Sequence, residues 1–211
     1  MYLAPIIDSV LESKKSSLLG QLTYFHITSI LDRAFKKTEP FKFRFETYQD
    51  YSKDDFSVSG LYDMTTDIRY IILNFSKHKK TLTIKQDNWE IFKFHISQTC
   101  QHESIHRDQW QHRDPPADLE TLDFRNTTGS IIDEKLYLAD IDEIDAYGHD
   151  IAMEITYNYP KQNPYDILKT IDNRKKVWSY IHYKKAFKGE KWEYVKNRLL
   201  KKTFLWLPYV K

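Results

Sequence analysis

The first third of the chain begins with a helical pattern of apolar positions. Between residues 5 and 37, apolar side chains such as Ile6, Val10 and Leu18 recur at steps of three and four, which predicts an amphipathic helix. Gly20 interrupts this pattern, and glycine weakens a helix interior by about 1 kcal/mol relative to alanine. The sequence therefore predicts a helical N-terminal segment made of either one helix or two.

After residue 40 the period of the pattern changes to two. Phenylalanines alternate with charged residues over 41–46, which predicts a half-buried strand. Residues 56–61 alternate in the same way and are the expected hairpin partner of that strand. Residues 67–75 are the most strand-like run of the chain, and residues 81–84 form either a short further strand or the approach to the next helix.

A helical pattern returns at Asp87 and continues to about Gln111. Asp87 is the expected N-cap, with Glu90 completing a capping box three residues later. The apolar residues of this segment fall on more than one side of a helical wheel, which is typical of a buried helix. They are Trp89, Phe92, Phe94, Ile96, Cys100, Ile105 and Trp110.

The remainder of the chain is expected to be helical around one polar stretch. Residues 112–135 contain Pro-Pro, Asn126 and Gly129, and irregular stretches of this length are commonly functional or mobile. Helices are predicted over 140–157, 165–184 and 190–205. We expect a single α+β domain spanning 1–211, with a core at about 38–160 and a helical C-terminal extension at about 161–211.

Composition narrows the class of protein. The 211 residues are 41% hydrophobic and 15% aromatic, which excludes a wholly disordered chain. The formal net charge of +2 does not predict the strong field of a dedicated nucleic-acid binder. The single cysteine, Cys100, excludes an internal disulfide framework.

The chain shows neither a secretory leader nor an apolar run of the roughly 20 residues that a membrane span needs, so we expect a cytoplasmic protein without a membrane partner.

One motif carries recognisable chemistry. His102, Glu103 and His106 form the pattern H-E-x-x-H within the predicted buried helix. Residues four apart lie on one helix face, so both imidazoles can reach one metal ion, and Zn²⁺ suits neutral imidazole. The glutamate can contact a metal-bound water and act as general base. The alternative is a surface helix carrying two hydrogen-bonded histidines.

A zinc enzyme also needs a third protein ligand. Glu143, at the start of the predicted helix over 140–157, is the favoured candidate. The small side chain of Ala146, one turn later, would let this helix approach the first one closely. Glu143 could instead be only part of a capping box led by Asp140. Three rival ligands remain open, namely Asp142, Asp145 and His149.

These two motifs resemble a known enzyme family. H-E-S-I-H at 102–106, followed by E-I-D-A-Y from 143, resembles the gluzincin type of zincin metallopeptidase and is similar to the ImmA/IrrE peptidases. Those peptidases carry E-x-x-A-N, whereas this chain has Tyr147 in place of the asparagine. The resemblance covers about 87–155. Together with the ending W-E-Y-V-K-N-R-L-L-K-K-T-F, it also looks like uncharacterised peptidase-like proteins of tailed bacteriophages.

The resemblance implies a zincin-like fold, with a small mixed sheet packed on the active-site helix. It implies a zinc-dependent peptidase that acts on a peptide or protein substrate, in the host cytoplasm or the virion. The substrate would pair with a strand that borders the cleft. Residues 67–75 are the best candidate for that edge, and a central core strand is the alternative. A second oxyanion donor is expected among Tyr147, His149, Tyr157, Tyr159 and His182.

Other residues have a possible structural role as well as a possible functional one. His95 lies near the face of His102 and is either an outer partner of the metal site or a satisfied core histidine. Cys100 is expected to be an inert core thiol. The lysines between 184 and 202 could contact nucleic acid, but solvated helix faces explain them as well, so nucleic acid is not an expected partner. The alternative to an enzyme is a non-catalytic binding protein or virion-associated structural protein with the zincin fold.

Overall fold

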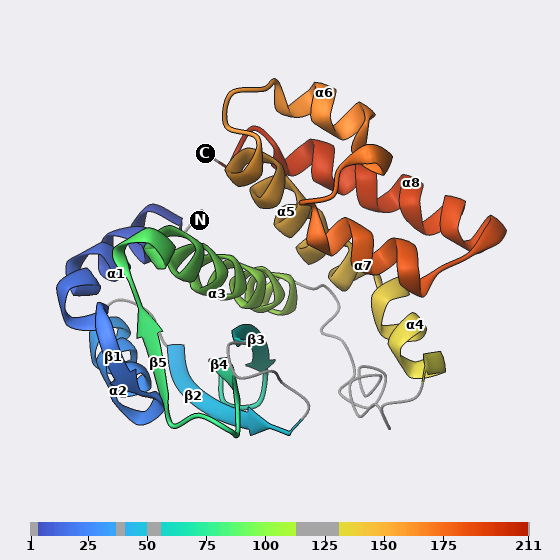
Figure 1. The fold of residues 1–211 in the computed structure, drawn as a ribbon. Coiled ribbons are helices and arrows are strands. Elements are labelled where there is room, and N and C mark those ends of the chain that lie inside the picture. Colours follow the sequence, from blue (N-terminus) through green and yellow to red (C-terminus); the bar gives the residue numbers. More distant parts are fainter. Residues whose placement is uncertain (1–3, 37–40, 50–55, 113–130, 211) are drawn as a thin grey trace. The chain divides into compact units, whose positions relative to one another are not determined.

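The computed structural model describes residues 4–36, 41–49, 56–112 and 131–210 (Figure 1). Its architecture is mixed α+β, as the sequence predicts. The chain divides into two compact units, Met1–Asp108 and Gln109–Lys211. All strands of the described residues belong to the first unit, and the second is helical. That one domain spans 1–211, with a core at about 38–160, stays a prediction.

The N-terminal segment contains two helices and an unexpected strand between them. Helix α1 is Ala4–Leu18, strand β1 is Gly20–Thr23 and helix α2 is Tyr24–Phe35. The prediction that the segment after Gly20 continues directly as helix was wrong. Gly20 has a φ of +112°, a value open mainly to glycine, and Thr23 caps α2 by accepting a hydrogen bond from the His26 backbone N–H. β1 pairs antiparallel with β5 (Thr81–Ile84), so residues 81–84 form a strand.

A second, three-stranded sheet contains β2 (Phe41–Tyr48), β3 (Phe56–Asp63) and β4 (Ile68–Ser76) in the order β2-β4-β3. The sheet is mixed, because β4 runs parallel to β2 and antiparallel to β3. The expected hairpin of residues 41–46 with 56–61 was therefore wrong. The expectation of residues 67–75 as an edge strand was also wrong, since β4 is central. Its nearly continuous apolar run is typical of a strand with neighbours on both sides.

The core of the first unit lies on one face of this sheet. Ile71, Leu73 and Phe75 of β4 belong to one buried apolar cluster with residues of α1, α2, β2 and helix α3 (Trp89–Gln111). As the helical wheel predicts, α3 contributes four residues from one side, Trp89, Phe92, Ile96 and Cys100.

The start of α3 differs from the sequence prediction. Asp87 is not the N-cap, because it lies inside a 3₁₀ turn, Gln86–Asn88, that precedes the helix. Asn88 accepts a hydrogen bond from the Lys85 backbone N–H through its side-chain oxygen, at 2.6 Å. A short polar side chain that bonds the nearby backbone stabilises such a turn, and the α-helix then begins at Trp89.

The second unit consists of helices. They are α4 (Ile131–Ala139), α5 (Ile141–Asn158), α6 (Pro164–Lys169), α7 (Trp178–Ala186) and α8 (Gly189–Trp206). The prediction of one helix over 165–184 was wrong, because a 3₁₀ turn (Ile171–Asn173) separates α6 from α7. Within the predicted irregular stretch over 112–135, residues 131–135 are helical. Residues 113–130 lie outside the described residues.

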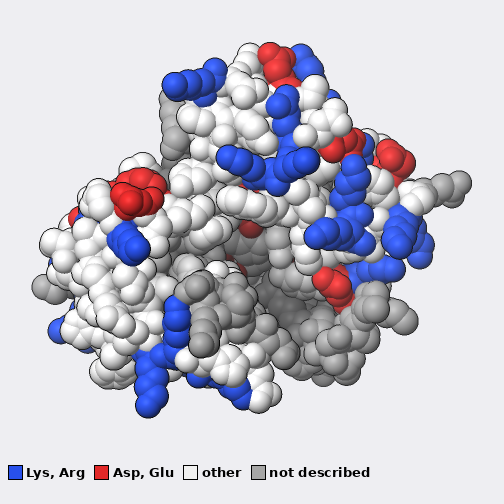
Figure 2. Space-filling model, in the orientation of Figure 1, with Lys and Arg blue, Asp and Glu red and all other residues white. Residues whose placement is uncertain are grey.

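Charged side chains gather on α7 and α8, where Figure 2 shows many lysines and arginines on one face. Several of these cations have acidic partners. Lys184 and Lys196 both contact Asp172 at 2.7 Å, and Lys202 lies 3.1 Å from Asp145. Among the described helices, none combines the length and apolar character needed to cross a membrane.

Candidate metal centre

The two histidines of H-E-x-x-H lie together on α3. His102 and His106 are 7% and 5% exposed, and their Nε2 atoms are 3.1 Å apart. The i,i+4 spacing on a continuous helix produces this approach. Two imidazole lone pairs that face one another repel unless a proton or a cation lies between them. The pair is therefore either hydrogen-bonded, with one Nε2 protonated, or ready to ligate one cation.

The separation of the two nitrogens fits a zinc ion. With Zn–N distances of about 2.0–2.1 Å and tetrahedral angles, two ligand nitrogens lie about 3.3 Å apart. The observed Nε2–Nε2 distance of 3.1 Å is close to this value. The alternative of a surface helix is wrong, because both imidazoles are buried.

Glu103 is buried on the side of α3 that faces the sheet. Its side chain is 5% exposed and lies against Gly60 of β3. A β-carbon at Gly60 would overlap three atoms of Glu103, namely Oε1, Cδ and Cγ. A glycine within a strand commonly marks a close approach of another group, and here that group is the predicted general base. Since β3 is an edge strand of the described sheet, the carboxylate lies beside that edge.

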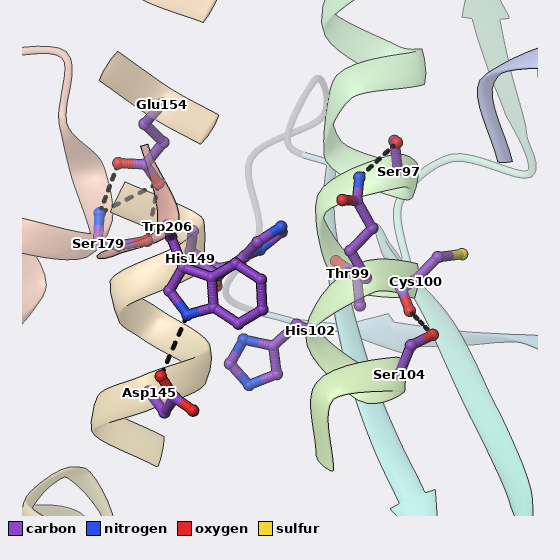
Figure 3. Close-up of polar contacts among 12 residues, drawn as sticks. Ser97, Thr99, Cys100, His102, Ser104, Asp145, His149, Glu154, Ser179 and Trp206 are labelled. Carbon is purple, nitrogen blue, oxygen red and sulfur yellow. Dashed lines mark hydrogen bonds and ion pairs between the residues drawn. The ribbon is translucent and has the colours of Figure 1, made fainter. Parts of the chain in front are cut away.

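A buried arginine ties the central strand to the same part of α3. Arg69 of β4 is 1% exposed and donates to the Ser104 hydroxyl at 2.7 Å. Ser104 in turn donates to the Cys100 backbone carbonyl at 2.7 Å (Figure 3). The guanidinium also lies over the Phe41 ring, 4.1 Å from its centroid. Ser104 follows Glu103 directly, so these contacts restrict the rotation of α3 about its axis at the motif.

A third contact fixes α3 one residue after His106. Arg107 donates two hydrogen bonds to Asp67, from Nε at 2.7 Å and from a terminal nitrogen at 2.8 Å. Asp67 lies in the turn between β3 and β4 with a φ of +52°, and it also accepts from the Tyr62 hydroxyl at 3.0 Å. The turn therefore holds the helix through a bidentate ion pair, a geometry that gives directional specificity.

Replacing Asp67 by asparagine is expected to destabilise the protein at neutral pH by about 1 kcal/mol, the scale of a partly exposed ion pair. The hydrogen bonds from Arg107 hold the pKa of Asp67 below its usual 3.8. A depressed carboxyl pKa adds stability above the unfolded-state pKa, and this is lost as the pH falls through the folded-state pKa. Asparagine also tolerates positive φ, so the variant tests charge rather than backbone strain.

Thermal unfolding of wild type and Asp67→Asn at neutral and strongly acid pH measures this effect. The difference between their unfolding midpoints is expected to shrink as the acid titrates Asp67. A difference that does not depend on pH would contradict the electrostatic explanation.

Glu143 occupies the first turn of α5. Asp140 is the N-cap of this helix, and its carboxylate accepts from the Asp142 backbone N–H at 2.8 Å. Glu143 itself is 3% exposed, so it is not merely a solvent-exposed helix-start residue. Ala146, one turn later, is fully buried.

Among the described residues, His102, His106 and Glu143 form a buried group that could hold a metal ion. Each offers one ligand atom, and these atoms lie within 4.8 Å of one another. The three rival ligands are not in this group. Of these, Asp145 accepts from the Trp206 indole N–H at 3.1 Å (Figure 3) and contacts Lys202. The roles of His102, Glu103, His106 and Glu143 stay predictions.

The five residues that the sequence suggests as oxyanion donors are spread over the second unit. His182 is 47% exposed and lies 3.6 Å from Glu134. His149 is buried, with its ring edge-on to Trp206 at 5.1 Å between centroids. Tyr159 lies under the Arg174 guanidinium. Tyr147 and Tyr157 are half-buried. None of these observations singles out an oxyanion donor.

Of two further residues of α3, Cys100 is the core thiol that the sequence predicts, whereas the role of His95 stays a prediction. Burial lowers the pKa of His95, which favours the neutral imidazole. Cys100 is fully buried, and burial raises the pKa of its thiol well above the usual value. It is therefore a protonated core thiol, as expected.

Sequence reasoning did not single out Gly60, Arg69 or Asp67, which lie against the α3 motif. Gly60 had a usable signal, because a glycine inside an alternating strand pattern suggests close backbone approach. Arg69 had one too, as a charged residue in an otherwise apolar strand. Nothing in the local sequence indicates which helix residue either would contact.

Comparisons with protein-family models, with curated proteins and with solved structures yield no match to this chain. The proposed class of protein therefore rests on the site alone.

Proposed function

We propose that this protein is a zinc-dependent peptidase of the gluzincin type, with His102, His106 and Glu143 as metal ligands. The observation that carries the proposal is the buried group of two imidazoles and one carboxylate. Removing two imidazoles and a carboxylate from water costs free energy, and a bound cation would offset part of that cost. Two histidines and a glutamate are a donor set typical of catalytic zinc, which keeps an open position for water or substrate.

Glu103 is the general base of the proposed reaction. Bound zinc would supply Lewis acidity, lowering the pKa of a coordinated water to about 7 and polarising the scissile carbonyl. Glu103 would take the proton of the attacking water and deliver it to the leaving amine. Its burial beside Gly60 and the contacts of Ser104 and Arg107 hold the carboxylate in one place, which positioned acid–base catalysis requires.

The substrate is proposed to be a peptide in extended conformation, added along β3. Within the described sheet, β3 pairs only with β4, so its other edge can accept main-chain hydrogen bonds. Gly60 of β3 is the residue against which Glu103 packs. A peptide paired with this strand would therefore run past the general base. This replaces residues 67–75 by β3 as the candidate edge.

Zinc content and peptide cleavage, measured on the same preparations, test the proposal. Wild type should contain one zinc per chain and cleave members of a peptide library. His102→Ala should lose both properties. His26→Ala, in an exposed position on α2, is the matched control and should keep both. If His102→Ala retains its zinc, the metal site is wrong. If wild type binds zinc but cleaves nothing, the non-catalytic alternative replaces the enzyme.

A further inference from the structure

Tyr183 on α7 carries a buried hydroxyl with no hydrogen-bond partner among the described residues. The side chain is 0% exposed. Its ring packs edge-on against Tyr147 of α5, with centroids 5.1 Å apart, and lies nearly parallel to Phe187 at 6.1 Å. Buried hydroxyl groups are nearly always hydrogen-bonded, because an unpaired one costs about 1–3 kcal/mol. We therefore expect the Tyr183 hydroxyl to form a hydrogen bond with a ligand, or with another group in a different state of the protein.

The position of Tyr183 is set by a cap between α5 and α7. Glu154 of α5 is 2% exposed and accepts hydrogen bonds from the Ser179 backbone N–H and, at 2.7 Å, from its hydroxyl (Figure 3). A carboxylate at a helix N-terminus is favoured by the helix dipole. Tyr183 lies about one turn after Ser179. Tyr147, against which the Tyr183 ring packs, lies one turn after Glu143 on α5. The Tyr183 side chain therefore lies on the side of α5 that carries Glu143, the proposed metal ligand.

The surroundings keep the phenol protonated. Burial raises the pKa of Tyr183 well above the usual 10, and Tyr147, Glu143, Asp150 and Asp140 raise it further, in that order. A phenol is protonated at neutral pH in any case, so the hydroxyl can act as a hydrogen-bond donor.

We infer that Tyr183 is a positioning residue of the metal centre, whose hydroxyl donates a hydrogen bond to Glu143 when that carboxylate ligates the metal. The inference rests on the proposed metal site. A carboxylate that ligates through one oxygen keeps lone pairs on the other, and in a buried site these need a donor. Such outer partners orient the ligand, and their loss typically weakens metal affinity 10–100-fold.

A purely structural role for Tyr183 leads to a different expectation for zinc affinity. If the hydroxyl had no function, its removal would relieve a buried unpaired group and would change nothing at the metal. The ring contacts with Tyr147 and Phe187 remain in Tyr183→Phe, so packing is preserved. Stability without zinc and affinity for zinc can therefore be separated in this one variant.

The experiment compares full-length wild type and Tyr183→Phe. Zinc affinity is measured by competition with a chromophoric chelator, and thermal unfolding is followed with and without metal. We expect zinc binding to weaken about 10–100-fold, while the unfolding midpoint of the metal-free protein is unchanged or higher. The absorption spectrum of the Co²⁺-substituted protein should also change, because its ligand field depends on how the carboxylate is held.

Tyr180→Phe is the matched control on the same helix. Tyr180 is 1% exposed, and its hydroxyl donates at 2.8 Å to Asp172, which also binds Lys184 and Lys196. Its removal should lower the unfolding midpoint of the metal-free protein and leave zinc affinity unchanged. The two variants thus have opposite expected signatures.

Three outcomes would overturn the inference. If Tyr183→Phe binds zinc as tightly as wild type, the hydroxyl does not position a ligand. If both variants weaken zinc binding equally, the effect comes from the packing of α7 and not from one donor. If wild type itself binds no zinc, the proposed metal site fails and this inference fails with it. The first two outcomes leave the metal site standing.

Discussion

Glu103→Gln is expected to lower the rate of peptide hydrolysis by about 10²–10⁴-fold, the typical contribution of positioned acid–base catalysis. Glutamine has nearly the same shape as glutamate and fits the same buried position beside Gly60. It cannot accept the proton of the attacking water. The variant should therefore keep its zinc, its fold and its affinity for a substrate-like inhibitor, and lose mainly kcat.

Glu90→Gln is the matched control for this experiment. Glu90 lies in the first turn of the same helix, its side chain is 59% exposed, and it contacts Lys93 at 2.9 Å. The same chemical change there should leave the rate of hydrolysis unaltered. A Glu103→Gln protein that cleaves as fast as wild type would remove Glu103 from the mechanism. A variant without zinc would show instead that Glu103 supports the metal site.

Gly60→Ala is expected to destabilise the protein by about 1–3 kcal/mol, the usual cost of an extra methyl group in a packed site. Positive φ occurs, among described glycines, at Gly20 and Gly189 and not at Gly60, so alanine meets no backbone strain there. The conflict is steric, with Oε1, Cδ and Cγ of Glu103. Because Glu103 is buried, it must move as a whole, and a shift of about 1 Å in a catalytic group can cost about 10²-fold in rate.

A double-mutant cycle isolates this contact. In a Glu103→Ala background the atoms that collide with the new methyl group are absent, so Gly60→Ala should cost much less stability than in wild type. The difference between the two costs, measured by denaturant unfolding, should be about 0.5–3 kcal/mol. Equal costs in both backgrounds would mean that Glu103 does not pack against Gly60. An unchanged kcat in Gly60→Ala would separate β3 from the position of the general base.

Local spacing predicted the part of the site that lies on one helix. His102 and His106 approach each other because four residues make about one helical turn, and this geometry does not depend on the rest of the fold. The buried side of α3 could be predicted for the same reason. The start of α3 was missed, because the side chain of Asn88 and the backbone of Lys85 form a turn that competes with the helix.

The order of the strands could not be predicted from periodicity. Alternation shows that residues 41–46 and 56–61 each have one buried face, but not which strand either pairs with. The parallel pairing of β2 with β4 joins residues distant in sequence, and its stability comes from the shared apolar cluster with α1, α2 and α3. The identity of the edge strand, and hence of the candidate substrate strand, follows only from that order.

The sequence by itself determined the α+β class, the H-E-x-x-H pattern of α3 and a short set of candidates for the third ligand. The tertiary structure decided which residues surround them. Gly60 meets Glu103, Asp67 holds Arg107, and the contact of Glu154 with Ser179 accompanies the packing of the Tyr183 ring against Tyr147. The physical reason is that helical spacing depends only on residues within one turn of the chain. Steric contacts and hydrogen bonds between elements depend instead on the tertiary packing, which many distant residues determine together.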